Sequence, residues 1–140
     1  MVRYAAISMT VAVHQVALGT TDLDRSAAFY SDVLRANPSA RFDPPGLLFF
    51  QIGDLRLLLE RHSSVEPGPS VVYFLVDDVQ SEVRRLRNLG VVFDSEPHLI
   101  HVDQDGTFGA PGTQEWMAFF RDPDQNSLAL IERRPRSIAA

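Results

Sequence analysis

The side chains that could carry chemistry are few, and they do not form a familiar catalytic pattern. The sequence contains no cysteine, which excludes disulfides, thiolate nucleophiles and zinc fingers. His98 and His101 lie three residues apart, a spacing that places two side chains on opposite faces of a regular strand. Glu60 is the candidate general base. Glu60, His98 and His101 are also the candidate ligands of a metal ion. The simpler interpretation is that all three are solvated at strand ends.

An Asp- and Gly-rich stretch, residues 103–114, resembles two ligand-binding loops without meeting the requirements of either. It begins Asp-Gln-Asp-Gly, like a calcium loop, but its twelfth residue is Gln114 where such a loop needs a bidentate Glu. Its three glycines recur at every third position, yet no Lys-Ser or Lys-Thr pair follows, so it is no phosphate loop. We expect a turn-rich loop whose candidate role is that of a lid.

Composition narrows the class of protein. The 140 residues fit one domain, and 45% hydrophobic residues can supply a core. A net charge of −5 argues against nucleic acid as a partner. No apolar run is long enough to span a membrane, and the first residues do not resemble a signal peptide. We therefore expect a cytoplasmic protein with no nucleic-acid or membrane partner.

The elements that must position these side chains are repeated. Residues 14–24 and residues 70–80 each show a strand, a turn and a helix start, and residues 48–59 resemble residues 118–130. A unit of about 60 residues is too small for an ample core of its own, so two copies that complete one another are expected. The expected parts are module one (11–61), a linker (62–69), module two (70–132) and a frayed tail (133–140).

The hydrophobic period predicts the order β-α-β-β-β in each half. The first helix is capped by Thr21 or Asp22 and ends before Pro38, and the second lies between Asp78 and Gly90. A loop is expected around Pro44. Strands are expected at 11–19, 47–51, 55–60, 71–76, 91–93, 98–102, 116–120 and 127–132.

Two motifs resemble those of a known superfamily. They are Asp-Leu-Asp-Arg-Ser-x-x-Phe-Tyr at residues 22–30 and Phe-Arg-Asp-Pro-Asp-x-Asn at residues 120–126. Together they are similar to the vicinal oxygen chelate superfamily, which includes glyoxalase I, bleomycin-binding proteins and extradiol dioxygenases. The resemblance covers residues 11–132. It implies an α+β fold in which two β-α-β-β-β modules pair into a cupped, incomplete mixed β-barrel with the helices outside.

The resemblance also implies where metal ligands would stand. The four family positions fall on Gln15, Leu58, Val71 and Ala129. Three of these side chains have no donor atom, whereas a catalytic metal normally needs about three protein ligands. We therefore expect no metal site and no cofactor, and a divalent metal remains the alternative.

The resemblance and the strand alternation together indicate a pocket in the cup. Its expected lining is Gln15, Arg56, Leu58, Glu60, Val71, Tyr73, Leu75 and Ala129, together with Trp116 or Met117. The first hypothesis is a glyoxalase/bleomycin-resistance-like protein that binds a small, largely apolar molecule there without metal. The alternative is a metal-dependent lyase, isomerase or dioxygenase with displaced ligands, and a third is an interaction module with a closed cup. A homodimer is expected, with modules paired within a chain or swapped between chains.

Overall fold

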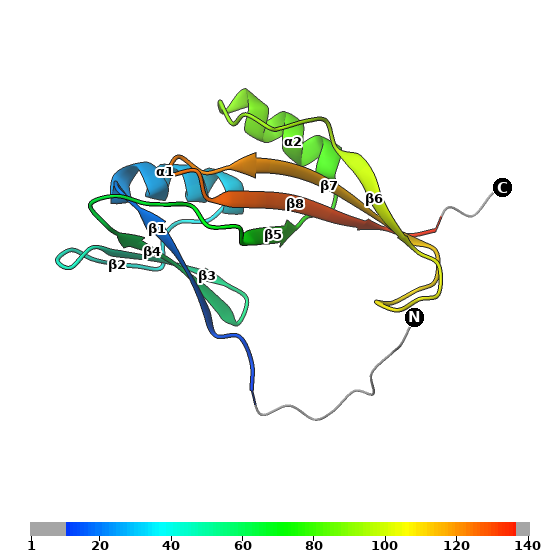
Figure 1. The fold of residues 1–140 in the computed structure, drawn as a ribbon, viewed down its shortest axis with the longest axis horizontal. Helices are drawn as coiled ribbons and strands as arrows, with labels where there is room; N and C mark the ends of the chain where they lie inside the picture. Colours follow the sequence, from blue (N-terminus) through cyan, green and yellow to red (C-terminus); the bar gives the residue numbers. More distant parts are fainter. Residues whose placement is uncertain (1–10, 137–140) are drawn as a thin grey trace. The chain divides into compact units, whose positions relative to one another are not determined.

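Residues 11–136 are described by a computed structural model, in which a strand, a helix and three strands follow one another twice (Figure 1). The elements of the first half are β1 (Gln15–Thr20), α1 (Leu23–Leu34), β2 (Ala40–Phe42), β3 (Leu47–Ile52) and β4 (Leu55–Arg61). Those of the second half are β5 (Val71–Leu75), α2 (Val79–Asn88), β6 (His98–Asp103), β7 (Thr113–Arg121) and β8 (Ser127–Arg134). The predicted α+β class and the predicted repeat are confirmed.

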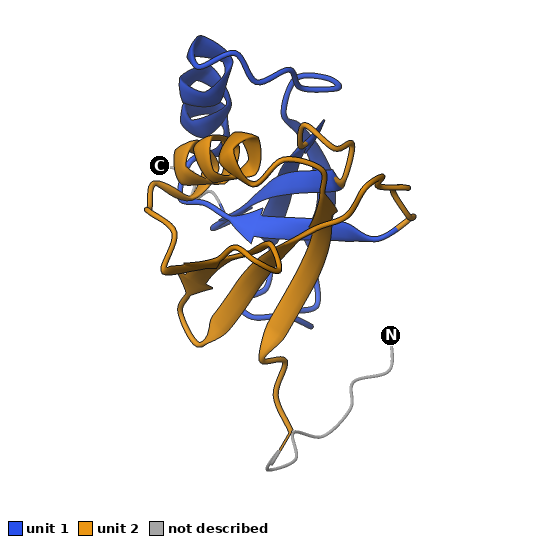
Figure 2. Cartoon of the chain, turned by 90° about the vertical axis from the view of Figure 1, so that its left-hand side faces the viewer, with its two compact units in different colours: residues 1, 70–121, 127–140 blue, residues 2–69, 122–126 orange. Residues whose placement is uncertain are grey.

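The chain divides into two compact units, which Figure 2 colours separately. Among the described residues, the N-terminal unit comprises 11–69 together with 122–126, and the C-terminal unit comprises 70–121 together with 127–136. The turn between β7 and β8 therefore belongs to the N-terminal unit, although both strands belong to the other. Within this part of the chain, no helix is long and apolar enough to cross a membrane.

The sheet of the N-terminal unit has the strand order β1-β4-β3-β2, with β1 parallel to β4 and the other pairs antiparallel. Helix α1 packs on one face, where Tyr30 meets Phe50 with 6.2 Å between ring centroids. The buried side chains of this core include Leu48, Phe50, Leu57, Leu59 and Tyr30. Because side chains alternate along a strand, the intervening residues point to the other face, here called the helix-free face of the N-terminal sheet.

The C-terminal unit repeats this design with the strand order β5-β8-β7-β6. Again the first strand is parallel to the last one, and the other pairs are antiparallel. Helix α2 packs on β7 and β8. Its core includes Val79, Val83, Leu86, Ala118, Phe120, Leu128 and Leu130. The opposite side is the helix-free face of the C-terminal sheet.

Both helices begin with an aspartate whose side chain accepts a hydrogen bond from a backbone N–H in the first turn. In α1 this residue is Asp22, which accepts from the N–H of Arg25, and in α2 it is Asp78, which accepts from Ser81. Of the two N-cap residues that the sequence allows for α1, Thr21 and Asp22, the structure shows Asp22. Gly90 follows α2 with φ of +96°, a conformation that suits glycine after a helix.

Five segments differ from the sequence-based expectation, and the first is β1, which begins at Gln15 and not at residue 11. Strand β2 lies where a loop was expected, and residues 91–93 form only a single bridge, from Phe93 to Phe120. The Phe93 side chain is buried against the Phe120 ring at 4.8 Å, so packing explains its apolar character without a strand. Strand β7 begins at Thr113, and β8 continues to Arg134, into the expected tail.

Candidate functional site

The two motif segments meet in one buried network of the N-terminal unit. The Tyr30 hydroxyl donates to Asp122 Oδ2 at 2.6 Å, and Asp122 Oδ1 accepts from the backbone N–H groups of Asp124 and Asn126. The Asn126 amide donates to the Gly19 carbonyl at 2.9 Å. Burial, followed by the charge of Asp122, raises the pKa of Tyr30 far above its usual value. These groups form hydrogen bonds with one another, so the network stabilises the fold and leaves no group of it open for a ligand.

Asp124 ties the same turn to the start of α1. Its Oδ1 accepts from the backbone N–H of Thr21 at 3.0 Å and from the Thr21 hydroxyl at 2.9 Å, and Arg25 pairs with it at 3.0 Å. Burial alone would raise the pKa of Asp124, but the hydrogen bonds from Thr21 and Thr20 and the charge of Arg25 lower it. Asp124 is recognisable in the sequence as part of the motif, but its partners Thr21 and Arg25 become evident only in the fold.

The helix-free face of the N-terminal sheet carries four residues of the expected pocket. The register sets Gln15 beside Arg56, Ala17 beside Leu58, and Gly19 beside Glu60. Arg56 also lies over the Phe49 ring, with Cζ 5.4 Å from the centroid. This face therefore has an amide and a guanidinium at one end, hydrocarbon in the middle, and a carboxylate at the other end.

Glu60, the candidate base, is engaged by a neighbouring histidine. Its Oε1 lies 3.0 Å from Nε2 of His62, in a contact that is charge-paired only when the imidazole is protonated. The Glu60 side chain is 46% exposed, so water reaches it freely. A solvated carboxylate of this kind has no structural feature that marks it as catalytic.

On the helix-free face of the C-terminal sheet, the side chains of β5 are apolar. Val71 pairs with Ser127, Tyr73 with Ala129, and Leu75 with Ile131. Tyr73 is 50% exposed and Leu75 is 70% exposed, which is unusual for large apolar side chains on a sheet face. The Tyr73 ring meets Phe119 edge-on, with 6.2 Å between centroids.

Trp116 does not share this face, which corrects the expected pocket lining. In the β7–β8 register Trp116 stands opposite Glu132, whereas Phe119 stands opposite Ala129. Residues 116 and 119 are an odd number apart in a regular strand, so their side chains point to opposite faces. Trp116 lies on the α2 side, where Arg134 covers its ring at 4.4 Å.

The two histidines of β6 share a face, so the prediction of opposite faces is wrong. His98 pairs with Met117 and His101 pairs with Glu115, and the register shifts between Leu99 and His101. Ile100 is the extra residue of this β-bulge, which places two residues of β6 against one of β7. Because residues 115 and 117 of β7 point the same way, both histidines lie on the helix-free face.

The side chains at the four family positions do not fit a divalent metal. Gln15 offers one amide oxygen, and Leu58, Val71 and Ala129 are hydrocarbon. Leu58 and Ala129 are also buried. Within residues 11–136, no three or more His, Asp or Glu side chains are grouped so that they could hold a metal ion. No catalytic step through a metal can be derived from these four residues.

The loop between β6 and β7 is firmly anchored. Asp103, which is buried, accepts from the backbone N–H groups of Thr107 at 2.8 Å and Phe108 at 2.9 Å. Arg133 donates to the Phe108 carbonyl at 3.0 Å and lies 3.4 Å from Glu115. The hydrogen bond from Phe108 is the main cause that lowers the pKa of Asp103. A role for this loop as a lid stays a prediction.

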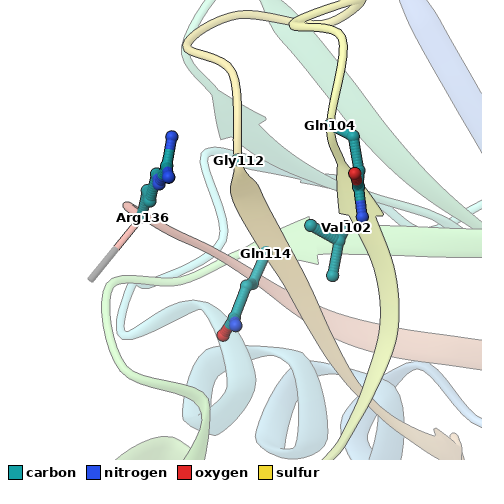
Figure 3. A pocket seen from close by; sticks show the side chains of 5 residues that line it. All are labelled: Val102, Gln104, Gly112, Gln114 and Arg136. Atoms are coloured by element: carbon teal, nitrogen blue, oxygen red, sulfur yellow. The ribbon is translucent and has the colours of Figure 1, made fainter. Parts of the chain in front are cut away.

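A pocket of about 380 Å³ lies on the α2 side of the C-terminal sheet, and Figure 3 shows the residues that line it. Val102 and Gln114 are opposite each other in the β6–β7 register, on the same face as Trp116. The pocket is lined by Val102, Gln104, Gly112, Gln114 and Arg136. Sequence reasoning missed it, because it treated the glycine-rich loop and the tail as separate irregular segments.

Comparison with known proteins identifies the family. The sequence model of the glyoxalase/bleomycin resistance protein/dioxygenase superfamily matches residues 12–130. Among curated proteins, none matches. A lactoylglutathione lyase from Agrobacterium tumefaciens is similar, with 27% identity, 86% of this chain and 92% of that chain covered, and a TM-score of 0.63.

Two further solved structures share the fold. A glyoxalase/bleomycin resistance protein/dioxygenase from Nocardioides has 18% identity and a TM-score of 0.66, covering 95% of this chain and 93% of that one. Fosfomycin resistance protein FosX from Listeria monocytogenes, complexed with Mn(II) and sulfate, has 19% identity and a TM-score of 0.64, covering 89% and 93%. The family match over nearly the whole chain, with the repeated strand and helix order, shows that this protein belongs to the glyoxalase/bleomycin resistance protein/dioxygenase superfamily.

Proposed function

We propose that this protein binds a small, largely apolar molecule on the helix-free faces of its sheets, without the metal of its superfamily. The observation that supports this most directly is the chemistry of the four family positions. Where a metal-dependent member needs donors, this chain has hydrocarbon at Leu58, Val71 and Ala129. Val71 is partly exposed, whereas Leu58 and Ala129 are buried, so these three positions contribute hydrocarbon and no donor atom to the sheets.

The C-terminal sheet supplies exposed apolar area for such a ligand. Tyr73 and Leu75 project from β5 with half or more of their surface open. Covering a leucine side chain completely is worth roughly 1.5–3 kcal/mol, so a ligand that covers both residues gains binding energy from contact alone. The Tyr73 hydroxyl offers one hydrogen bond at the edge of that surface.

The N-terminal sheet supplies polar groups that would orient the ligand. Gln15 is exposed, and its register partner Arg56 has a buried Nε with no hydrogen-bond partner among the described residues. A buried donor without a partner costs free energy, which a ligand oxygen would recover. We therefore propose a ligand with an apolar body and one hydrogen-bond acceptor.

Metal analysis tests the absence of the family site. We expect the purified, tag-free protein to contain no stoichiometric metal, and its melting temperature to be the same in EDTA and in Mn(II), Fe(II), Co(II), Ni(II) or Zn(II). A metal that binds only the native state would raise the melting temperature by mass action. Stoichiometric metal whose removal lowers the melting temperature would overturn the proposal.

A thermal-shift screen with neutral apolar compounds such as indole and naphthol tests the ligand class. Leu75→Glu places a charge on the proposed surface and is expected to weaken any hit by about tenfold or more. Leu89→Glu is the matched control, since Leu89 is 53% exposed at the end of α2 and lies on no sheet face. Equal loss of binding in both variants would refute the assignment of the surface.

A metal-dependent lyase, isomerase or dioxygenase with displaced ligands is the second candidate. It is favoured by the bulge at Ile100, which puts the imidazoles of His98 and His101 on one face. If metal analysis finds a bound ion, single His98→Ala, His101→Ala and Glu60→Gln variants identify its ligands. Loss of the metal in these variants, with an unchanged fold by circular dichroism, would establish this candidate over the first.

We also propose that the protein is a cytoplasmic homodimer, as its acidic composition and its family suggest. Sedimentation equilibrium measures the oligomeric state directly. A monomer at all concentrations would refute the dimer without affecting the ligand proposal.

A further inference from the structure

We propose a second ligand site in the C-terminal unit, the pocket of Figure 3, and assign it to a small organic carboxylate. It lies on the α2 side of the sheet, whereas Tyr73 and Ala129 lie on the helix-free face, so it is separate from the surface proposed above. Its lining combines one cation, two amides and one apolar side chain (Figure 3). The argument rests on how each of these groups is held.

Gln114 is held so that it presents a donor. The Trp116 indole N–H donates to Gln114 Oε1 at 2.9 Å, which fixes the orientation of the amide and leaves the NH2 group to donate elsewhere. Trp116 is itself held by Arg134, whose guanidinium lies 4.4 Å from the ring centroid. The pocket therefore presents a fixed hydrogen-bond donor to whatever occupies it.

Arg136 is the cation of the pocket, and no carboxylate among the described residues pairs with it. The two preceding arginines differ in this respect, since Arg133 lies near Glu115 and Arg134 pairs with Glu132. The hydrocarbon stem of Arg136 lies on Gly112, where an added Cβ would be 2.8 Å from Cδ. The guanidinium thus keeps its full capacity for a bidentate carboxylate contact.

The backbone around the pocket is organised in advance. Gly112 donates to the Asp103 carbonyl at 2.7 Å, and Gln104 donates to the Val102 carbonyl at 3.0 Å. Gly112 has φ of +85°, a conformation in which other residues are strained. Little ordering is then needed when a ligand enters, which favours binding.

The same lining selects the chemical class of the ligand. One guanidinium and two amides match a single carboxylate, while Val102 offers an apolar wall for an alkyl or aryl body. Phosphate groups are usually held by several cations or by a series of backbone N–H groups, which this pocket lacks among the described residues. A volume of about 380 Å³ admits a small acid with a body of this kind.

Benzoate is the probe for the test, and Trp116 is the reporter, because it is the only tryptophan of the chain. Benzoate is titrated at constant ionic strength while the single indole N–H signal is followed by 1H–15N NMR. We expect a saturable shift, and Arg136→Gln should weaken binding by about tenfold. Arg84→Gln, which removes an equal charge from an exposed position of α2, should change it by less than about twofold.

Gln104→Leu is the second variant, and we expect it to weaken binding without altering the Trp116–Gln114 hydrogen bond. The proposal fails if benzoate causes no saturable shift, if Arg136→Gln binds as well as the parent, or if inorganic phosphate binds more tightly than benzoate. Benzoate bound instead on the helix-free face would be sensitive to Leu75→Glu and indifferent to Arg136→Gln. The two proposals can therefore fail separately.

Discussion

The two helices are held to the molecule in different ways, although the same elements surround them. Helix α1 is bound by the turn 122–126, through Asp122 to Tyr30 and through Asp124 to Thr21. Helix α2 is bound by a strand residue, Glu132, whose Oε1 accepts from the backbone N–H of Val79 at 2.9 Å. A repeated fold thus keeps its strand and helix order while the polar contacts that fix each copy diverge.

This difference explains why the motif residues of the turn are poor guides to function. Asp122, Asp124 and Asn126 are the polar residues of the second motif, and all three are buried and take part in structural hydrogen bonds. In the N-terminal unit a conspicuous polar motif stabilises the fold. The candidate site residues are instead inconspicuous ones, such as Leu58 and Tyr73.

Asp122→Ala should have the largest effect on stability. It leaves the Tyr30 hydroxyl and the backbone N–H groups of Asp124 and Asn126 without their acceptor, and we expect a loss of about 3–5 kcal/mol in the free energy of unfolding. Urea denaturation measures it. Asp54→Ala, in the exposed turn of the equivalent β3–β4 hairpin, is the control and should be nearly neutral. Similar losses in both variants would show that the turn 122–126 is not special.

Glu132→Ala should lower the free energy of unfolding by less than Asp122→Ala does. It removes one buried acceptor at α2, whereas Asp122→Ala disrupts the whole hydrogen-bond network at α1. Val79 keeps the Asp78 cap beside it, and Arg134 keeps Gln80 as a partner. We expect a loss of about 2 kcal/mol, measured by the same denaturation. A loss as large as that of Asp122→Ala would contradict the contrast between the two helices.

Tyr30→Phe removes only the hydroxyl and keeps the ring against Phe50. We expect a loss of about 1–2 kcal/mol, since Asp122 retains its bonds to Asn126. Combining Tyr30→Phe with Asp122→Ala in a double-mutant cycle measures the coupling between the two groups. Strict additivity would mean that this hydrogen bond contributes nothing of its own.

The smallest effect is on the dependence of stability on pH. The pKa values of Asp124 and Glu132 are both lowered in the folded state, so their contribution is present above the ordinary carboxyl pKa and is lost as pH falls through the folded pKa. We expect the free energy of unfolding to decrease as the pH is lowered from about 4.5. Asp124→Asn with Glu132→Gln should flatten this slope, and Glu66→Gln, in the exposed linker, should not. An unchanged slope in the double variant would exclude these two carboxylates as its cause.

Much of the fold follows from local signals in the sequence. The short apolar runs within residues 55–60 and 127–132, each preceded by a polar turn, predict β4 and β8. Asp22 and Asp78 predict the helix starts, because capping acts within a few residues. The composition of the C-terminal residues predicts that Arg133 and Arg134 belong to a frayed tail. They continue β8 because Arg134 meets Glu132, Gln80 and the Trp116 ring, none of which its own position reveals.

The candidate site was less predictable, because its geometry depends on long-range pairing. Strand alternation predicts that Gln15, Arg56, Leu58 and Glu60 share one face. The register of β1 and β4 places them on that face. Trp116 was assigned to the wrong side, since a strand position misjudged by one residue changes the face. Asp122 and Tyr30 are 92 residues apart, and only the tertiary fold brings them together.

Because of the bulge at Ile100, the faces to which the side chains of β6 point depend on the number of residues in the strand. In a regular strand, the set of side chains on one face changes by substitution, one position at a time. Here the extra residue alone decides that His98 and His101 face the same way. Deleting that residue would restore strict alternation and send one imidazole to the α2 side. An insertion or deletion in this edge strand can therefore bring two imidazoles to one face or separate them without changing either histidine.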